Sequence, residues 1–164
     1  MPETSLLMLY NAIIYPHLSY CNIIWGCCNK TNIDSLFKLQ KRALRYVTGS
    51  KFNAPSSPIF ARLCKLKLAE INLLQIATFM FHAKNHNLPD VFCDYFQQNL
   101  TVHCHHTRNV AKYHVINCRT NLRKASIRYI GPSVWNKIII SIREAPSVLL
   151  FKKMYTDHLL SFYT

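Results

Sequence analysis

The chain has 164 residues and a mass of 19.1 kDa, which is the size of one ordinary domain or two very small ones. Half of the residues are hydrophobic, which excludes a mainly disordered chain, and the three Gly are too few for a glycine-rich phosphate loop or a turn-rich β fold. The 20 Lys and Arg outnumber the 7 Asp and Glu, for a formal net charge of +13, and this excess predicts a polyanionic partner, most often nucleic acid.

The first predicted helix, at residues 4–15, is followed by a proline. Pro16 has no N–H to donate, so we expect it to break or kink the chain, with a second helical piece at 18–25 that Gly26 ends. Residues 4–29 carry no formal charge, but their Asn, His and Ser side chains are costly in hydrocarbon, so a buried helix is favoured over a membrane span. The apolar residues at helical spacing are Leu6, Leu9, Ile13 and Ile14.

The most distinct predicted helix ends at Thr48, with Thr31 or Asn32 as its N-cap and Gly49 as its C-terminal stop. A solvated helix face usually mixes charges of both signs, whereas one face of this helix carries four cations with no acid between them. We call this set the basic ridge and interpret it as a phosphate-binding surface: Lys38, Lys41, Arg42 and Arg45. The opposite face is apolar: Ile33, Leu36, Phe37, Ala43, Leu44 and Val47.

Two further helices complete a predicted bundle at residues 1–89. Pro58 suits the first turn of a helix that Ser57 caps. Residues 68–84 are apolar nearly all round, which is typical of a helix in the centre of a bundle. The apolar face of the shorter helix comprises Ile59, Phe60, Leu63 and Leu66.

The pattern changes in residues 90–164, which we expect to form a C-terminal extension packed on the bundle or part of a single domain with it. One helical turn near Phe92 and a His-rich loop at 97–112 precede residues 113–130, which fit either short strands or irregular extended chain. Pro132 and Ser133 predict a helix through about Ile142. The last helix follows Pro146 and Ser147, with a buried stripe of Phe151, Tyr155, Leu159 and Phe162. The predicted fold class is mainly α: a helical bundle, an irregular segment around 97–130, and C-terminal helices.

No constellation of residues predicts catalysis or a metal centre. The acids are scattered, and the helically spaced pair Asp90 and Asp94 follows Pro89, where acids are common at a helix start. His103, Cys104 and His106, with Cys118 nearby, are weak candidates for zinc ligands because their spacing fits no known finger pattern. We therefore expect no metal, no cofactor and no enzymatic activity of the chain alone.

The seven Cys are odd in number and irregular in spacing, and Glu3 stands where a secretory signal would be basic. We expect reduced thiols and an intracellular protein, nuclear or cytoplasmic, that is neither secreted nor bound to a membrane.

Two acid-free stretches, residues 35–69 and 95–143, each hold eight Lys and Arg. Such blocks predict an extended electropositive surface for RNA, DNA or an RNA–DNA hybrid. The candidate nucleic-acid-binding residues are Lys38, Lys41, Arg42, Arg45, Arg62, Lys65, Arg108, Arg119, Arg123, Lys124 and Arg128.

Several short motifs occur in the order found in one family. They are the run Leu9-Tyr10 through Ile13-Ile14-Tyr15-Pro16-His17-Leu18-Ser19-Tyr20-Cys21, then Ile24-Trp25-Gly26, Ile33, Leu36, Leu39-Gln40-Lys41-Arg42-Ala43, Arg45, Thr107-Arg108-Asn109, Arg119-Thr120-Asn121, Ser126, Tyr129, Gly131-Pro132, Trp135-Asn136 and Phe151-Lys152. This ordered set resembles the region after the catalytic palm in reverse transcriptases of non-LTR (LINE-type, jockey-like) retrotransposons. The chain departs from the family at Arg123, where Gly is usual, and at His105-His106, where a Tyr-Asn pair is usual.

The resemblance implies a C-terminal fragment of an RNA-directed DNA polymerase, comprising the thumb and a following extension. The fingers and the palm with its metal-binding Asp pair would lie before Met1, so the missing polymerase domains are an expected partner. A thumb grips the template–primer duplex through its phosphates, which requires cations on a helix face and no carboxylates.

Two alternative interpretations of the sequence differ in whether they use this basic surface. A domesticated helical nucleic-acid-binding protein would have the same surface and no polymerase partner, and the genomic sequence upstream of the Met1 codon would distinguish it. A small metal-dependent enzyme would need a clustered set of acids or of Cys and His, which the sequence does not offer.

Overall fold

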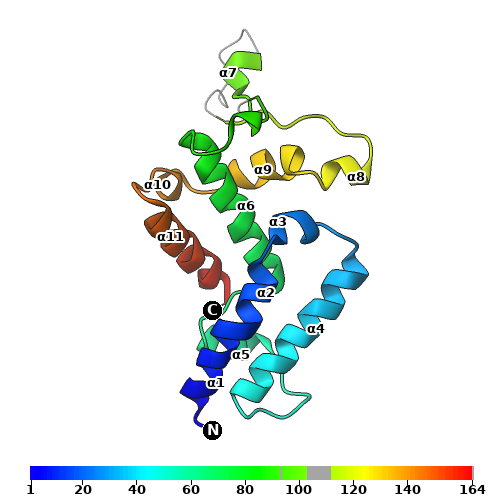
Figure 1. Ribbon diagram of the computed structural model, residues 1–164, viewed down its shortest axis with the longest axis vertical. Helices are drawn as coiled ribbons and strands as arrows, with labels where there is room; N and C mark the ends of the chain where they lie inside the picture. Colours follow the sequence, from blue (N-terminus) through cyan, green and yellow to red (C-terminus); the bar gives the residue numbers. More distant parts are fainter. Residues whose placement is uncertain (93, 103–111, 164) are drawn as a thin grey trace. The chain divides into compact units, whose positions relative to one another are not determined.

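The computed structural model describes residues 1–92, 94–102 and 112–163, and the chain is mainly helical, which confirms the predicted fold class (Figure 1). It divides into two compact units. The first comprises Met1–Asn72 and the C-terminal residues from Tyr155, and the second comprises Leu73–Met154. The expected boundary after residue 89 therefore falls inside the second unit. Within the described part of the chain, no helix has the length and apolar character needed to cross a membrane.

The N-terminal helical run of the first unit continues through Pro16 instead of breaking there. It consists of α1 (Glu3–Leu9), the π-helix η1 (Tyr10–Ile14) and α2 (Tyr15–Ser19). The N–H of Tyr15 bonds to the carbonyl of Tyr10, five residues back, and this wider turn brings Pro16 into the first turn of α2, where a missing N–H costs little.

The buried face of this run differs from the predicted stripe. Tyr10 and Leu18 are buried, whereas Leu9 and Ile13 are 45% and 56% exposed. Leu6, Tyr10 and Ile14 recur every four residues and pack with Leu44 and Val47 of α4, whereas Leu9 and Ile13 lie on a neighbouring, exposed face.

The chain turns after α2 at Cys21, which has a left-handed backbone with a φ of 49°. Helix α3 (Asn22–Trp25) follows, and Gly26 caps its C-terminus as predicted. A side chain at Gly26 is excluded because its Cβ would lie 2.1 Å from Nδ2 of Asn72. Asn72 donates from that nitrogen to Oδ1 of the buried Asn22 at 2.7 Å, so the two amides fasten α3 to the start of α6 (Leu68–Lys84).

Helix α4 (Lys30–Val47) begins two or three residues earlier than predicted and ends one residue before the predicted Thr48, which is its C-cap. Its N-cap is Asn29, whose side-chain oxygen accepts from the N–H of Thr31 at 3.4 Å, instead of Thr31 or Asn32. Gly49 has a φ of +62°, and the N–H of Ser50 bonds to the carbonyl of Arg45 at 3.0 Å. This is the Schellman arrangement, in which glycine allows the left-handed residue that ends a helix.

A buried glutamine on α4 links three segments of the first unit. The side-chain nitrogen of Gln40 donates to the hydroxyl of Tyr10 at 3.1 Å and to the carbonyl of Leu66 at 2.9 Å, and Gln40 is 1% exposed. Leu44 and Val47 lie on the same side of α4 and pack with Tyr10 into one apolar cluster. The face of α4 that packs into the core is therefore determined by the buried amide of Gln40 together with Leu44 and Val47.

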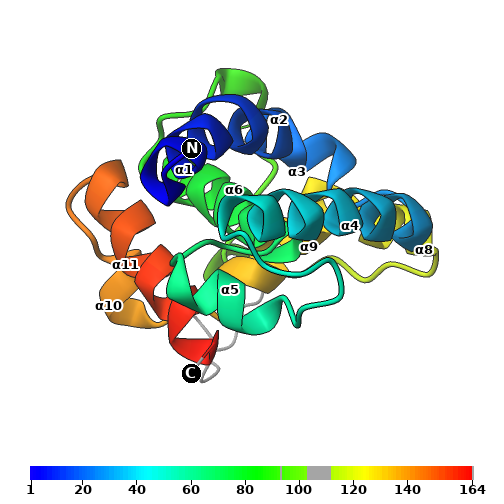
Figure 2. The same cartoon turned by 90° about the horizontal axis from the view of Figure 1, so that it is seen from below.

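Helix α5 (Ser57–Arg62) packs on α4 (Figure 2), where the rings of Phe37 and Phe60 lie 6.0 Å apart. Ser56 precedes this helix as the N-cap residue, one position before the predicted Ser57, and Pro58 lies in the first turn as expected. Of the predicted apolar face, Ile59, Phe60 and Leu66 are buried and Leu63 is half-buried.

The C-terminus is fastened to the start of α6, which has the predicted bounds of 68–84. Glu70 accepts a hydrogen bond from the backbone N–H of Lys67 at 2.8 Å and another from the hydroxyl of Tyr163. Burial is the main cause that raises the pKa of the Glu70 carboxyl. The chain bends into a 3-10 helix, η3 (Ser161–Tyr163), so Tyr163 packs inward and Phe162, predicted to be buried, is 70% exposed.

The second unit is built around most of α6 and α11 (Val148–Leu160). Phe151 is fully buried, with ring centroids of Phe81 and Trp135 at 4.7 Å and 5.8 Å. The smaller elements are η2 (Asp90–Phe92), α7 (Asn99–Val102), α8 (Asn121–Lys124), α9 (Ile127–Trp135) and α10 (Ile140–Arg143). Of the predicted stripe on α11, Phe151, Tyr155 and Leu159 are confirmed as buried.

One prediction for the second unit, a helix opened by Pro132, is wrong. Helix α9 begins at Ile127, so Pro132 lies inside the helix and does not open it. Gly131 explains this, because a Cβ there would lie 2.7 Å from Sδ of Met80, and the missing side chain lets α9 approach α6 closely. Of the two alternatives for residues 113–130, irregular chain holds at 114–118, which is followed by α8 and the start of α9, and the one β-bridge among the described residues joins Gln98 to Tyr113.

The Gln40 linkage predicts a measurable stability effect. Replacing Gln40 by Leu leaves the hydroxyl of Tyr10 and the carbonyl of Leu66 without this donor, but it also removes the buried Oε1, which has no partner in the described chain, so the free energy of unfolding should fall by about 1–2 kcal/mol. Urea unfolding followed by circular dichroism measures the change. Gln98→Leu, at an exposed position, is the matched control and should change stability by less than about 0.5 kcal/mol. Equal stability of the two variants would contradict the role given to Gln40.

Tyr155 predicts a loss of stability at alkaline pH. Burial raises the pKa of its phenol to about 12, so the folded chain favours the neutral form. The stabilisation from the neutral phenol is fully present below about pH 10, which is the pKa of tyrosine in the unfolded chain. As the pH rises from there through the folded pKa of about 12, this stabilisation is lost at about 1.4 kcal/mol per pH unit. Tyr155→Phe should therefore lose less stability than the wild type between pH 9 and pH 11. Parallel pH profiles of the two proteins in urea unfolding would refute this prediction.

Candidate nucleic-acid interface

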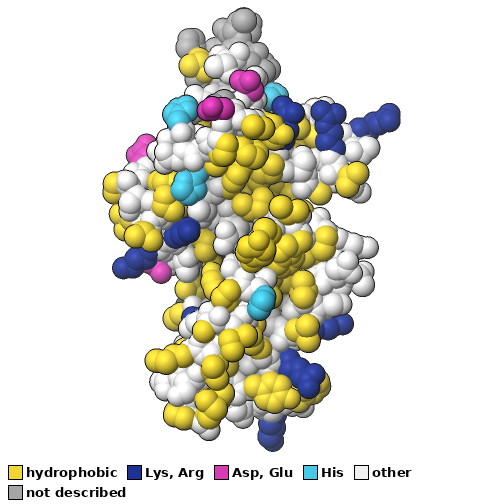
Figure 3. All heavy atoms as spheres, in the orientation of Figure 1, with side chains coloured by type: hydrophobic (Ala, Val, Ile, Leu, Met, Phe, Trp, Pro, Cys, Tyr) yellow, Lys and Arg dark blue, Asp and Glu magenta, His cyan; other side chains and the backbone are white. Residues whose placement is uncertain are grey.

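The basic ridge lies on the outward face of α4. Lys38 and Arg42 are exposed, and Lys41 and Arg45 are half-buried. At 100° per residue the four positions fall within about a quarter of the helix circumference, opposite Gln40. In the space-filling view, Lys and Arg side chains lie over α4 beside hydrophobic side chains (Figure 3). The structure thus brings together the four cations that the sequence assigned to one face.

Neighbouring groups hold three of the four cations in place. Lys41 places its Nζ 4.6 Å from the ring centroid of Phe37, at the range of a cation–π contact. Arg45 donates from Nε to the carbonyl of Ala54 at 2.9 Å, which leaves its terminal guanidinium nitrogens for other acceptors. The third, Arg42, lies over Tyr46, with 5.7 Å between its Cζ and the ring centroid.

No carboxylate of the described residues forms an ion pair with the ridge. Asp34 lies one turn before Lys38 on the same side of α4 and is exposed. Glu3 is paired with Arg62, and Glu70 is hydrogen-bonded to Tyr163. Asp34 thus lies beside Lys38, whereas Lys41, Arg42 and Arg45 have no acid within one turn of α4, which gives an electropositive strip towards the C-terminal end of the helix.

The other predicted binding residues have different surroundings. Arg62 donates to Glu3 at 3.0 Å, so its charge is neutralised by a partner 59 residues away in the sequence. Lys65 is half-buried, and Arg108 lies outside the described residues.

The second unit carries its own basic set on and around α8. Thr120 caps this short helix by accepting from the N–H of Arg123 at 3.4 Å. Arg128, at the start of α9, lies over the ring of Tyr95 at 4.7 Å. The exposed members of this set are Arg119, Arg123, Lys124 and Arg128.

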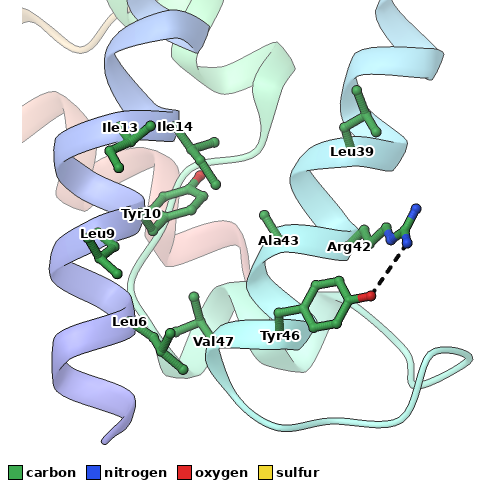
Figure 4. A pocket seen from close by; sticks show the side chains of 10 residues that line it. All are labelled: Leu6, Leu9, Tyr10, Ile13, Ile14, Leu39, Arg42, Ala43, Tyr46 and Val47. Atoms are coloured by element: carbon green, nitrogen blue, oxygen red, sulfur yellow. Dashed lines mark hydrogen bonds between the residues drawn. The ribbon is translucent and has the colours of Figure 1, made fainter. Parts of the chain in front are cut away.

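The helices α1 and η1 and the neighbouring α4 enclose an apolar groove of about 490 Å³. Arg42 is its one charged lining residue, and the dashed line in Figure 4 marks the hydrogen bond of 3.4 Å between Arg42 Nη2 and the hydroxyl of Tyr46. The other residues that line the groove are Leu6, Leu9, Tyr10, Ile13, Ile14, Leu39, Ala43 and Val47 (Figure 4).

Two aromatic residues next to the ridge were not recognised in the sequence as candidate binding residues. Tyr46 is 66% exposed and Phe52 is 78% exposed. The spacing of Arg42 and Tyr46 by four residues was a usable signal, because such residues meet on one helix face. Phe52 stands in a loop after Gly49, where sequence spacing does not show which side chains meet.

The candidate zinc ligands His103, Cys104 and His106 lie outside the described residues, and Cys118 is buried. In residues 1–92, 94–102 and 112–163, no three His, Cys, Asp or Glu side chains are grouped as metal ligands would be. Burial raises the pKa of the Cys27 thiol, which disfavours its reactive thiolate form.

In comparisons with known proteins, no family model, no curated protein and no solved structure matches the chain. The resemblance to non-LTR reverse transcriptases therefore rests on the sequence motifs alone and stays a prediction.

Proposed function

We propose that this chain binds the phosphate backbone of a nucleic acid through the basic ridge on α4. The observation that carries the proposal is the set of four cations on one helix face, held opposite the buried Gln40, with no carboxylate paired to any of them in the described chain. The sequence resemblance supports the wider proposal that the chain is the thumb and C-terminal extension of a retrotransposon reverse transcriptase. In that setting the bound nucleic acid would be the template–primer.

The dimensions of the ridge fit one strand of nucleic acid. Lys38 and Arg45 are seven residues apart, which at 1.5 Å per residue is about 10 Å along the helix. One strand of a duplex advances about 3.4 Å per phosphate along its axis, so the ridge spans about three phosphates. Arginine guanidinium groups can bind phosphate oxygens in a bidentate manner, whereas lysine acts as a point charge.

Our proposal is one of binding without catalysis. Polymerases hold their two catalytic metals on closely placed carboxylates, whereas two of the acids of the first unit already have structural partners. Glu3 is paired with Arg62, and Glu70 fastens the C-terminus through Tyr163. In a complete polymerase the catalytic carboxylates would come from the missing domains that the resemblance implies.

The salt dependence of binding tests the proposal. Each phosphate contact releases condensed counterions, so the logarithm of affinity falls with the logarithm of salt by about 0.7–0.9 per contact. Replacing Lys38, Lys41, Arg42 and Arg45 together by Gln should flatten that slope by about two to three units for every sequence tested. Fluorescence anisotropy with a labelled RNA–DNA hybrid between 50 and 300 mM salt measures it, and circular dichroism verifies the fold.

The matched control replaces the exposed cations of the second unit, Arg119, Arg123, Lys124 and Arg128, by Gln. Both variants lose four positive charges, so general attraction to a protein of charge +13 would weaken them equally. A larger loss of slope in the α4 variant supports the ridge. Equal losses, or an unchanged slope in the α4 variant with the helicity retained, would refute the proposal.

A further inference from the structure

A shallow hollow lies next to the ridge, on the side of the loop that follows α4. Its volume is about 70 Å³. The exposed rings of Tyr46 and Phe52 line it together with Arg42, Arg45 and Ser50. These rings present apolar π-faces to solvent directly beside two arginine guanidinium groups.

The loop that carries Phe52 is fixed by hydrogen bonds to the ridge. The N–H of Ala54 bonds to the carbonyl of Lys51 at 3.0 Å, which closes a turn around Phe52. The carbonyl of Ala54 in turn accepts from Nε of Arg45 at 2.9 Å. At the other end of the loop, the hydroxyls of Thr48 and Ser50 are 2.7 Å apart. The two sides of the hollow are therefore held in place without a ligand.

From this geometry we infer that Tyr46, Phe52 and Arg42 form a stacking site for one unpaired nucleobase, and this inference rests on the proposed function. Aromatic rings and a guanidinium plane offer π-faces that any of the bases can stack on, without recognition of sequence. The hollow is too shallow to enclose a ligand, so the base must belong to a strand that is held elsewhere. The ridge would bind the phosphates of that strand, because Arg42 and Arg45 line the hollow and belong to the ridge as well.

This site predicts a preference for a single strand over a blunt duplex. Bases inside a duplex have both faces covered by their neighbours, whereas an unpaired base has a free face for Tyr46 or Phe52. Removal of an aromatic ring that stacks with a base weakens binding by roughly 10-fold or more. Stacking involves no phosphate, so its loss should leave the salt slope unchanged.

The test compares Tyr46→Ala with Phe52→Ala, singly and together, in the full chain. The probes are a labelled 12-nucleotide RNA of mixed sequence and the blunt 12-base-pair RNA–DNA hybrid that contains it. The matched control is the double replacement Tyr20→Ala with Phe162→Ala, since these rings are 77% and 70% exposed in the same unit and do not line the hollow. Tyr46→Phe keeps the ring and removes the hydroxyl that bonds to Arg42.

We expect the double variant at Tyr46 and Phe52 to bind the single strand at least 10-fold more weakly, and the hybrid within about twofold of wild type. Tyr46→Phe and the control should bind both probes as the wild type does. Equal losses for both probes, or a flatter salt slope, would overturn the inference, because the rings would then act only by positioning Arg42.

The outcomes separate this inference from the proposed function. If the ridge variant loses its salt slope while the ring variants bind normally, the stacking site is refuted and phosphate binding stands. If the wild type binds neither probe, both proposals fail, and the exposed rings belong to a protein contact instead.

Discussion

One buried amide, together with its apolar neighbours, sets the side of α4 on which the basic ridge lies. Gln40 cannot lose its hydrogen-bond partners without leaving buried polar groups unpaired, so its donors stay on Tyr10 and Leu66. These two bonds tie α4 to η1 and to the chain that leads into α6, and with the packing of Leu44 and Val47 they oppose rotation of α4 about its own axis. Residues half a turn away then have to face solvent, which places the basic ridge outside. The orientation of a charged surface thus depends on a neutral side chain in the core.

The parts of the fold that could be predicted are those with a strong local signal. The periodic apolar residues of α4, the nearly all-apolar run of α6 and the stop at Gly49 predicted elements that the structure confirms, because these signals act within one or two helical turns. The errors lie where packing between distant segments overrides a local rule. Pro132 is inside α9 because Gly131 lets that helix approach Met80, and Phe162 is exposed because Tyr163 reaches Glu70 instead.

The residues of the candidate site likewise divide into those that local sequence signals could place and those that they could not. Charge and helical spacing were sufficient to place Lys38, Lys41, Arg42 and Arg45 on one face, since both properties can be read from adjacent turns. The ion pair of Arg62 joins residues 59 positions apart, and the hollow at Phe52 depends on a loop that bends back to Arg45. Neither has a local signal, so the sequence assigned Arg62 to binding and left Phe52 out. The burial of Gln40 could not be predicted from the sequence either, because its partners Tyr10 and Leu66 are distant in the chain.

The contacts within the ridge imply a division of roles among its cations. Arg45 is fastened to the carbonyl of Ala54 and Arg42 lies over Tyr46, so both lose little conformational freedom when they bind. Ordered arginines of this kind favour a defined position of the strand. Lys38 is exposed and has no such contact in the described chain, so ordering it would cost more and its charge acts mainly through long-range attraction. The end of α4 near Gly49, where the ordered arginines and the exposed rings meet, is therefore where a bound strand would be positioned, and the end near Lys38 is where it would first be attracted.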